Sequence, residues 1–117
     1  MRVLLDESVP RALGRELVGH DWSTVPRMGW SGLVNGVLLG VVVDTGFEVL
    51  LTCDRNMQKQ QNVSALGLAL VVIAVPDTKI QTIQPLVPDI LAVLVLQRYL
   101  SPEAVLTIWK QACNRSV

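Results

Sequence analysis

A run of eight consecutive apolar residues extends from Leu68 to Val75 and is closed by Pro76 and Asp77. A strand with water on one side alternates apolar and polar residues, whereas a strand covered on both faces is apolar throughout. The run is too short for a membrane-spanning helix. It therefore predicts a central strand of a mostly parallel sheet with helices on both faces, which is a three-layer α/β fold.

Other strands and helices are predicted to alternate along the chain, which indicates right-handed crossovers and a sheet of about four strands. Apolar runs predict three further strands, at residues 2–5, 22–25 and 47–53. The predicted helices are one capped by Ser8, with Val9, Leu13 and Leu17 on its apolar face; one over 36–45 with Asn35 as N-cap and Gly46 as its stop; one over 79–96, bent or restarted around Pro85 and Pro88; and one over 102–112. The 117 residues predict a single domain with one hydrophobic core.

The composition excludes several classes of site and partner. Ten basic and ten acidic residues cancel, so no bulk positive field attracts nucleic acid, and a polyanion must be held by a few Arg or Lys or by a metal. His20 is the one histidine in the sequence, which excludes a His-based metal cluster and disfavours a Ser-His-Asp triad. Cys53 and Cys113 lack the spacing of metal ligands and fit a reducing cytoplasm. We expect a cytoplasmic protein without a membrane span.

Acidic residues follow three of the predicted strands. Asp6 and Glu7 come after the first, Asp54 after the third and Asp77 after the fourth. The carboxyl ends of parallel strands form the ligand crevice of an open α/β sheet. Clustered carboxylates need a counter-charge, and oxygen ligands suit Mg²⁺ or Mn²⁺, which assist phosphodiester cleavage. The pattern predicts a metal site, with capping of the following helices as the alternative.

Basic and aromatic residues near this predicted edge are candidates for contacting RNA. The predicted phosphate-binding residues are Arg55, Lys59 and Arg11. For Arg15 an ordinary solvated surface position is the better expectation. We expect Trp22 to pack in the core, and Trp30 is the candidate for stacking on a base.

Several motifs occur in an order and spacing that resemble a short bacterial PIN-like domain over about residues 1–90. The motifs are MRVLLDESVP at the start, His20-Asp21 with Thr24-Val25, GWSGL at 29–33 with Asn35-Gly36, LTCDRN at 51–56, and Gln60-Gln61-Asn62. The resemblance implies a PIN-type α/β fold and RNA cleavage dependent on Mg²⁺ or Mn²⁺, with Asp6 and Asp54 matching the strand-end acids. It also implies a toxin with a partner antitoxin.

One position departs from the PIN-like pattern. Relatives usually carry a further carboxylate where the helix near residue 35 begins, and this chain has Asn35, which offers a neutral oxygen or a helix cap. The predicted catalytic residues are Asp6, Asp54, Glu7 and Asn35, and the predicted metal ligands are Asp6, Asp54 and Asp77. The expected activity is that of a metal-dependent endoribonuclease, whose competence depends on Asp77, Glu7 or the neutral Asn35 serving in place of the missing acid.

Two other functions remain open from the sequence. The first is an inactive interaction module, in which the helix and tail at 101–117, beyond the PIN-like match, dock a second copy or an antitoxin. The second is a phosphoreceiver signalling domain, which has a similar length, an early acidic pair and an Asp after its third strand. Its late strand ending in Lys-Pro is not found, because Lys110 is expected in the last helix and no proline follows it.

Overall fold

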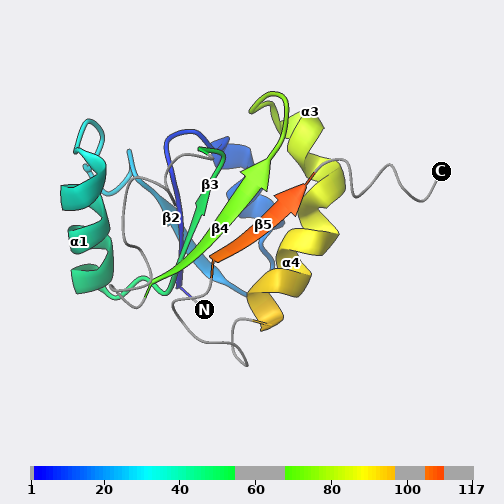
Figure 1. Ribbon diagram of the computed structural model, residues 1–117. Helices are drawn as coiled ribbons and strands as arrows, with labels where there is room; N and C mark the ends of the chain where they lie inside the picture. The colour runs from blue at the N-terminus through cyan, green and yellow to red at the C-terminus, as the bar shows by residue number, and fades with distance from the viewer. Residues whose placement is uncertain (1, 55–67, 97–104, 110–117) are drawn as a thin grey trace.

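A computed structural model describes residues 2–54, 68–96 and 105–109. Within these residues five parallel strands form one sheet in the order β2-β1-β3-β4-β5 (Figure 1). The strands are β1 (Arg2–Leu5), β2 (Asp21–Thr24), β3 (Val49–Thr52), β4 (Ala69–Ala74) and β5 (Val105–Trp109). The helices are the 3-10 helices η1 (Arg11–Glu16) and η3 (Gln84–Leu86) and the α-helices α1 (Asn35–Thr45), α3 (Ile80–Ile83) and α4 (Val87–Leu96). No helix in the described ranges is long and apolar enough to cross a lipid bilayer.

The strand order places a topological switch point between β1 and β3. The chain leaves β1 toward β2 on one side and then continues with β3 on the other side, so Leu5 pairs with Thr24 in β2 and with Leu51 in β3. Because every pair is parallel, the carboxyl ends of all five strands lie at one edge of the sheet. In open α/β sheets ligands bind at this edge, where the order reverses.

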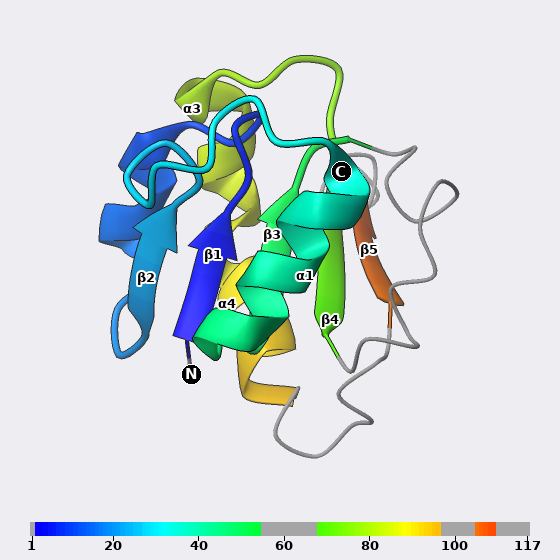
Figure 2. The same ribbon diagram turned by 90° about the vertical axis from the view of Figure 1, so that its left-hand side faces the viewer.

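Helices cover both faces of the sheet, which confirms the predicted three-layer α/β fold. In Figure 2, α1 lies in front of the sheet and α4 lies behind it. Successive strand residues point to opposite faces, so Leu4 packs in the core beneath α1, while Val3 and Leu5 pack in the core with η1, α3 and α4. All six residues of β4 are buried, as a strand covered on both sides requires.

Three of the four predicted helices are found in outline, with corrections at their ends. The segment 79–96 restarts as α3, η3 and α4 around its two prolines, since proline lacks the N–H that a continuous helix needs. Helix α1 ends at Gly46, whose φ of +95° suits glycine, but its N-cap is Val34, so Asn35 is the first helical residue. The first predicted helix is the short 3-10 helix η1, which Ser8 does not cap.

The predicted helix over 102–112 is wrong for residues 105–109. These residues form β5, which pairs with β4 from Leu70–Val105 to Ala74–Trp109. Four of its five residues are β-branched or aromatic, which favours a strand, although their spacing also fits one face of a helix. The predicted homodimer was to form through this helix. Its predicted contact surface is therefore not a helix over residues 105–109. Lys110, expected within the helix, directly follows a strand in the sequence.

Candidate active site at the carboxyl edge of the sheet

Two of the predicted acids follow the strands that flank the switch point. Asp6 comes directly after β1, and its N–H donates to the Leu51 carbonyl of β3 at 2.9 Å. Asp54 comes two residues after the end of β3. The Thr52 hydroxyl links them, because it donates to Oδ2 of Asp6 at 2.9 Å and accepts the N–H of Asp54 at 3.0 Å. The structure thus brings Asp6 and Asp54 to neighbouring strand ends, joined through one side chain.

The Asp6 carboxylate is held by two hydroxyl groups. Its Oδ2 accepts from Ser8 Oγ and from Thr52 Oγ1, each at 2.9 Å. The two hydroxyl oxygens lie 3.3 Å apart, but each carries one proton, so both protons are used when both groups donate to Asp6. Thr52 is fully buried and Asp6 is half-buried. Hydrogen bonds to a charged acceptor are strong, and these two fix the orientation of the carboxylate.

Two backbone amides extend this hydrogen-bond network. The Cys53 N–H donates to Ser8 Oγ at 3.0 Å, and the Asp54 N–H donates to Thr52 Oγ1 at 3.0 Å. Each hydroxyl therefore accepts from an amide and donates to the carboxylate, and bonds in such chains polarise one another. The negative charge of Asp6 is stabilised by the chain segment that follows β3.

The Cys53 thiol lies beside this cluster. Burial, and to a smaller extent the negative charge of Asp6, raises the pKa of Cys53 to about 11. At neutral pH the thiol is therefore protonated, and a protonated thiol is a poor nucleophile and a poor metal ligand. This environment fits a structural rather than a chemical role for Cys53.

Glu7 and Asn35 come to the same edge by different routes. The Glu7 side chain is exposed, and its Oε1 accepts the Gly32 N–H at 3.2 Å, which ties the acidic pair to the loop before α1. Helix α1 begins at Asn35 on the side of the sheet toward which the strand arrows point (Figure 2). The backbone thus puts Asn35 at the carboxyl edge, three residues after Gly32, whose N–H donates to Glu7.

Asp77 takes part in a local turn. Its Oδ1 accepts the Lys79 N–H at 3.0 Å and the Thr82 hydroxyl at 2.6 Å, just before and within α3. The side chain is exposed, and neither Asp77 nor Asp54 is among the residues that line the cleft described below. This geometry matches the alternative expectation, that a strand-end acid organises the start of the next helix. Arg55 and Lys59, predicted to bind phosphate, lie outside the described residues.

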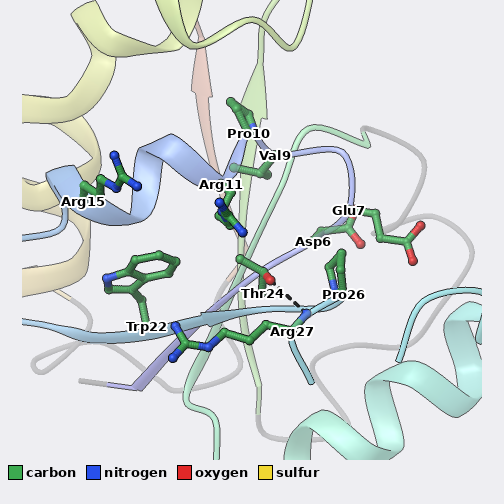
Figure 3. A pocket seen from close by; sticks show the side chains of 10 residues that line it. All are labelled: Asp6, Glu7, Val9, Pro10, Arg11, Arg15, Trp22, Thr24, Pro26 and Arg27. Carbon is green, nitrogen blue, oxygen red and sulfur yellow. Dashed lines mark hydrogen bonds between the residues drawn. The ribbon is translucent and has the colours of Figure 1, made fainter. Parts of the chain in front are cut away.

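A cleft of about 920 Å³ opens beside Asp6. Its acidic end carries Asp6 and Glu7, and three arginines together with an indole ring border the remainder (Figure 3). The lining residues are Asp6, Glu7, Val9, Pro10, Arg11, Arg15, Trp22, Thr24, Pro26 and Arg27. Arg11 lines the cleft with the acids, in agreement with its predicted position, and Arg15 joins it against expectation. The cleft is therefore negative at one end and positive at the other.

Both tryptophans pack against the core, and Trp22 rather than Trp30 borders the cleft. Trp30 is half-buried and meets the Phe47 ring edge-on with centroids 6.1 Å apart, so it packs on the core beneath α1. Trp22 also contacts the core but borders the cleft. The position of Trp22 follows from the pairing of β2 with β1, which aligns Trp22 with Val3 on the face of the sheet that η1 covers.

Sequence reasoning missed four polar residues of the site: Ser8, Thr24, Arg27 and Thr52. Thr52 carried a usable signal, since it is a polar residue in the otherwise apolar stretch from Val49 to Cys53. Arg27 carried none, because it lies in an irregular turn and reaches the cleft only through the pairing of β2 with β1.

The donor groups of the site fit a hard cation rather than a tightly caged metal. In residues 2–54, 68–96 and 105–109 no group of three or more His, Cys, Asp or Glu side chains could hold a metal ion. Mg²⁺ is commonly held by one or two carboxylates together with waters and substrate phosphate oxygens. Asp6 and Asp54 supply that number of carboxylates at neighbouring strand ends, and Thr52 and Ser8 orient the first of them.

Comparisons with known proteins give no match: no family model fits the chain, and no curated protein or solved structure matches it.

Proposed function

We propose that this protein is a metal-dependent endoribonuclease of PIN-like type, with its site at the switch point between β1 and β3. The observation that carries the proposal is the placement of Asp6 and Asp54 after these two adjacent parallel strands, joined through Thr52. The sequence motifs that resemble PIN-like domains support the choice of RNA as substrate. A toxin role with a partner antitoxin belongs to the same proposal and rests on that resemblance alone.

The acids at the switch point would supply the ligands of the metal ion. A bound Mg²⁺ or Mn²⁺ would supply charge neutralisation at the scissile phosphate and lower the pKa of an attacking water. Asp6 and Asp54 would hold that ion, and Ser8 and Thr52 keep the Asp6 carboxylate in one orientation. Glu7 follows Asp6 in the sequence and Asn35 begins α1 at the same edge, and we assign both a supporting role there.

The decisive experiment measures cleavage of single-stranded RNA with Mn²⁺, with Mg²⁺ and with EDTA. We expect cleavage that requires the metal and falls by more than about tenfold in Asp6→Asn, since even residues that only support a metal ligand cost 10–100-fold when removed. The substitution keeps the side-chain shape and an oxygen that Ser8 and Thr52 can contact. Folding of the variant is checked by circular dichroism.

The matched control is Asp44→Asn. Asp44 is an exposed acid in the last turn of α1, next to Thr45, whose carbonyl accepts a 2.8 Å hydrogen bond from Arg2 at the start of β1. It therefore lies at the amino edge of the sheet and should leave cleavage unchanged. Equal loss in both variants, or cleavage that persists in EDTA, would remove the case for a metal site at Asp6.

A phosphoreceiver domain is the second candidate, and the strand order favours it. The order β2-β1-β3-β4-β5 is that of flavodoxin-like folds, which include receiver domains. Lys110 follows β5 in the sequence, which removes the main objection raised from the expected helix, although no proline comes after it. In this alternative Asp54 would accept a phosphoryl group and Asp6 and Glu7 would hold the metal.

Incubation with acetyl phosphate and Mg²⁺ separates the two candidates. A receiver should gain one phosphoryl group, visible by mass spectrometry, and Asp54→Asn should abolish the gain. A ribonuclease should remain unmodified and should cleave RNA under the same metal conditions.

A further inference from the structure

Within residues 2–54 and 68–96, most of the positively charged side chains line the cleft. Residues 2–54 and 68–96 contain five Arg and Lys residues and nine Asp and Glu residues, and three of the five but two of the nine line the cleft. The three are Arg11, Arg15 and Arg27, which come from η1 and from the turn after β2. A local field of this kind attracts an anion even when the whole chain carries no net charge.

The three arginine side chains are exposed and available to a ligand. None of the hydrogen bonds or ion pairs found within the described ranges engages their guanidinium groups. The guanidinium group of Arg2, in contrast, has protein partners. It donates to the Thr45 carbonyl at 2.8 Å and lies 4.8 Å from the centre of the Phe47 ring. A guanidinium group can donate two parallel hydrogen bonds to two oxygens of one phosphate, so arginines suit a phosphate ligand.

Trp22 borders the same part of the cleft and is held in place from one side. A Cβ added at Gly14 would lie 2.3–2.4 Å from three consecutive atoms of the six-membered ring, so the Gly14 backbone lies against the indole. The side chain is half-buried, and its remaining surface borders the cleft with Arg15 and Arg27 (Figure 3). An indole fixed in this way is a stacking surface for a nucleobase.

The backbone that carries Arg27 is also fixed. The buried Thr24 hydroxyl accepts the Arg27 N–H at 3.1 Å, and the Thr24 carbonyl accepts the Met28 N–H at 3.0 Å. The end of β2 and the following turn therefore hold Arg27 at the border of the cleft, while its long side chain stays free to adjust.

We propose that Arg11, Arg15, Arg27 and Trp22 form a nucleotide-binding subsite, called here the arginine–tryptophan subsite. It takes one nucleotide of single-stranded RNA, with the base on Trp22 and the adjoining phosphates on the arginines. The strand must be single, because a base within a duplex is already stacked on its neighbours. The proposal deepens the proposed function, since the bound strand is the one whose phosphodiester reaches Asp6 at the other end of the cleft.

The test measures binding by fluorescence anisotropy in EDTA, with a fluorescein-labelled single-stranded hexaribonucleotide and an abasic hexamer of equal charge. The parent should bind the complete hexamer about tenfold more tightly than the abasic one, as expected for one stacked base. Trp22→Leu should remove that difference, and Trp30→Phe, on the opposite face of the sheet, should preserve it. Trp22→Leu is used only if its circular dichroism spectrum matches that of the parent.

Arg27→Gln tests the phosphate half without touching the core. It should weaken binding of both hexamers and reduce the slope of log K against log salt by about 0.7, the value for one phosphate contact to a single strand. Lys79→Gln removes an exposed cation outside the cleft lining and should leave the slope unchanged. An equal change in both variants would mean diffuse attraction and would overturn the subsite.

The remaining outcomes separate the subsite from the ribonuclease proposal. Equal affinity for the two hexamers, or equal competition by a polyglutamate peptide of the same charge, would overturn the nucleotide subsite. RNA cleavage with an unchanged KM in Arg27→Gln would overturn the subsite and leave the ribonuclease proposal standing. The predicted binding pattern in a protein that cleaves nothing would support the subsite and refute the ribonuclease proposal.

Discussion

The acidic end of the cleft and the arginine–tryptophan subsite differ in how their side chains are held. At the acidic end, Asp6 follows β1 directly and its carboxylate accepts two hydroxyl hydrogen bonds, one from the fully buried Thr52. At the other end the guanidinium groups of Arg15 and Arg27 are exposed, and the described residues offer them no hydrogen-bond partner. Only the backbone around Arg27 and the indole of Trp22 are fixed there.

Under the proposed function, this difference would separate a rigid reaction centre from an adaptable binding surface. A cation between carboxylates needs ligands held in a narrow geometry, which strand ends and buried hydrogen bonds provide. A nucleotide of variable sequence needs charge and a flat aromatic surface rather than a fixed hydrogen-bond pattern. Substitutions at the acidic end should therefore lower the stability of the fold. Substitutions of exposed residues in the arginine–tryptophan subsite should weaken only RNA binding.

The largest stability loss is expected for Gly14→Ala, which acts on the fixed part of the arginine–tryptophan subsite. The new Cβ would lie 2.3 Å from the Trp22 ring, and overpacking of this kind typically costs about 1–3 kcal/mol. Thermal melts should show a clearly lower Tm. Gly40→Ala is the control, because nothing lies within 4 Å of its Cβ and replacing a mid-helix glycine should stabilise α1 by about 0.5–1 kcal/mol. A Tm that is the same in both variants would show that Gly14 does not support Trp22.

The next largest loss of stability is expected for substitution of Thr52 at the acidic end, and Thr24 at the other end of the cleft is its comparison. Thr52→Val removes a donor to Asp6 and an acceptor for the Asp54 N–H, and unfolding measurements should show a loss of about 1–3 kcal/mol. Thr24→Val removes one acceptor for the Arg27 N–H and should cost about 1 kcal/mol. A greater loss for Thr24→Val would reverse the assignment of the rigid end. Ribonuclease activity should also fall in Thr52→Val by about 10–100-fold, because the orientation of Asp6 is lost.

The smallest effect is expected in the pH dependence of the reactivity of the Cys53 thiol, which lies beside Asp6. Its pKa is raised from 9.0 to about 11, so the folded protein favours the neutral thiol, and this contribution to stability is lost as the pH rises from 9 through 11. In a Cys113→Ala background, alkylation by iodoacetamide should still rise tenfold per pH unit between pH 9 and 10. In urea the rate should instead level off near pH 9. A native rate that levels off near pH 9 would show that the thiol does not share the buried surroundings of Asp6.

The sequence was sufficient for most of the sheet and for the acidic end. Buried parallel strands are apolar runs, so β1, β3 and β4 could be predicted, and Asp6 and Asp54 come one and two residues after the ends of β1 and β3. Strand β5 was missed because Val105, Ile108 and Trp109 have a spacing that fits a strand and one face of a helix equally. Of the arginine–tryptophan subsite only Arg11 was predicted to bind phosphate. Its grouping with Trp22 and Arg27 could not be predicted, since that depends on β2 pairing beside β1.

The central claim is that one divalent cation binds between the ends of β1 and β3, and titration of ¹⁵N-labelled protein with Mn²⁺ tests it most directly. Paramagnetic broadening should first remove the amide signals of Asp6, Cys53 and Asp54, while those of the last turn of α1 at the amino edge stay sharp. Asp6→Asn should restore the lost signals at the same Mn²⁺ concentration. Broadening centred on another part of the chain, or broadening that Asp6→Asn leaves unchanged, would contradict the account.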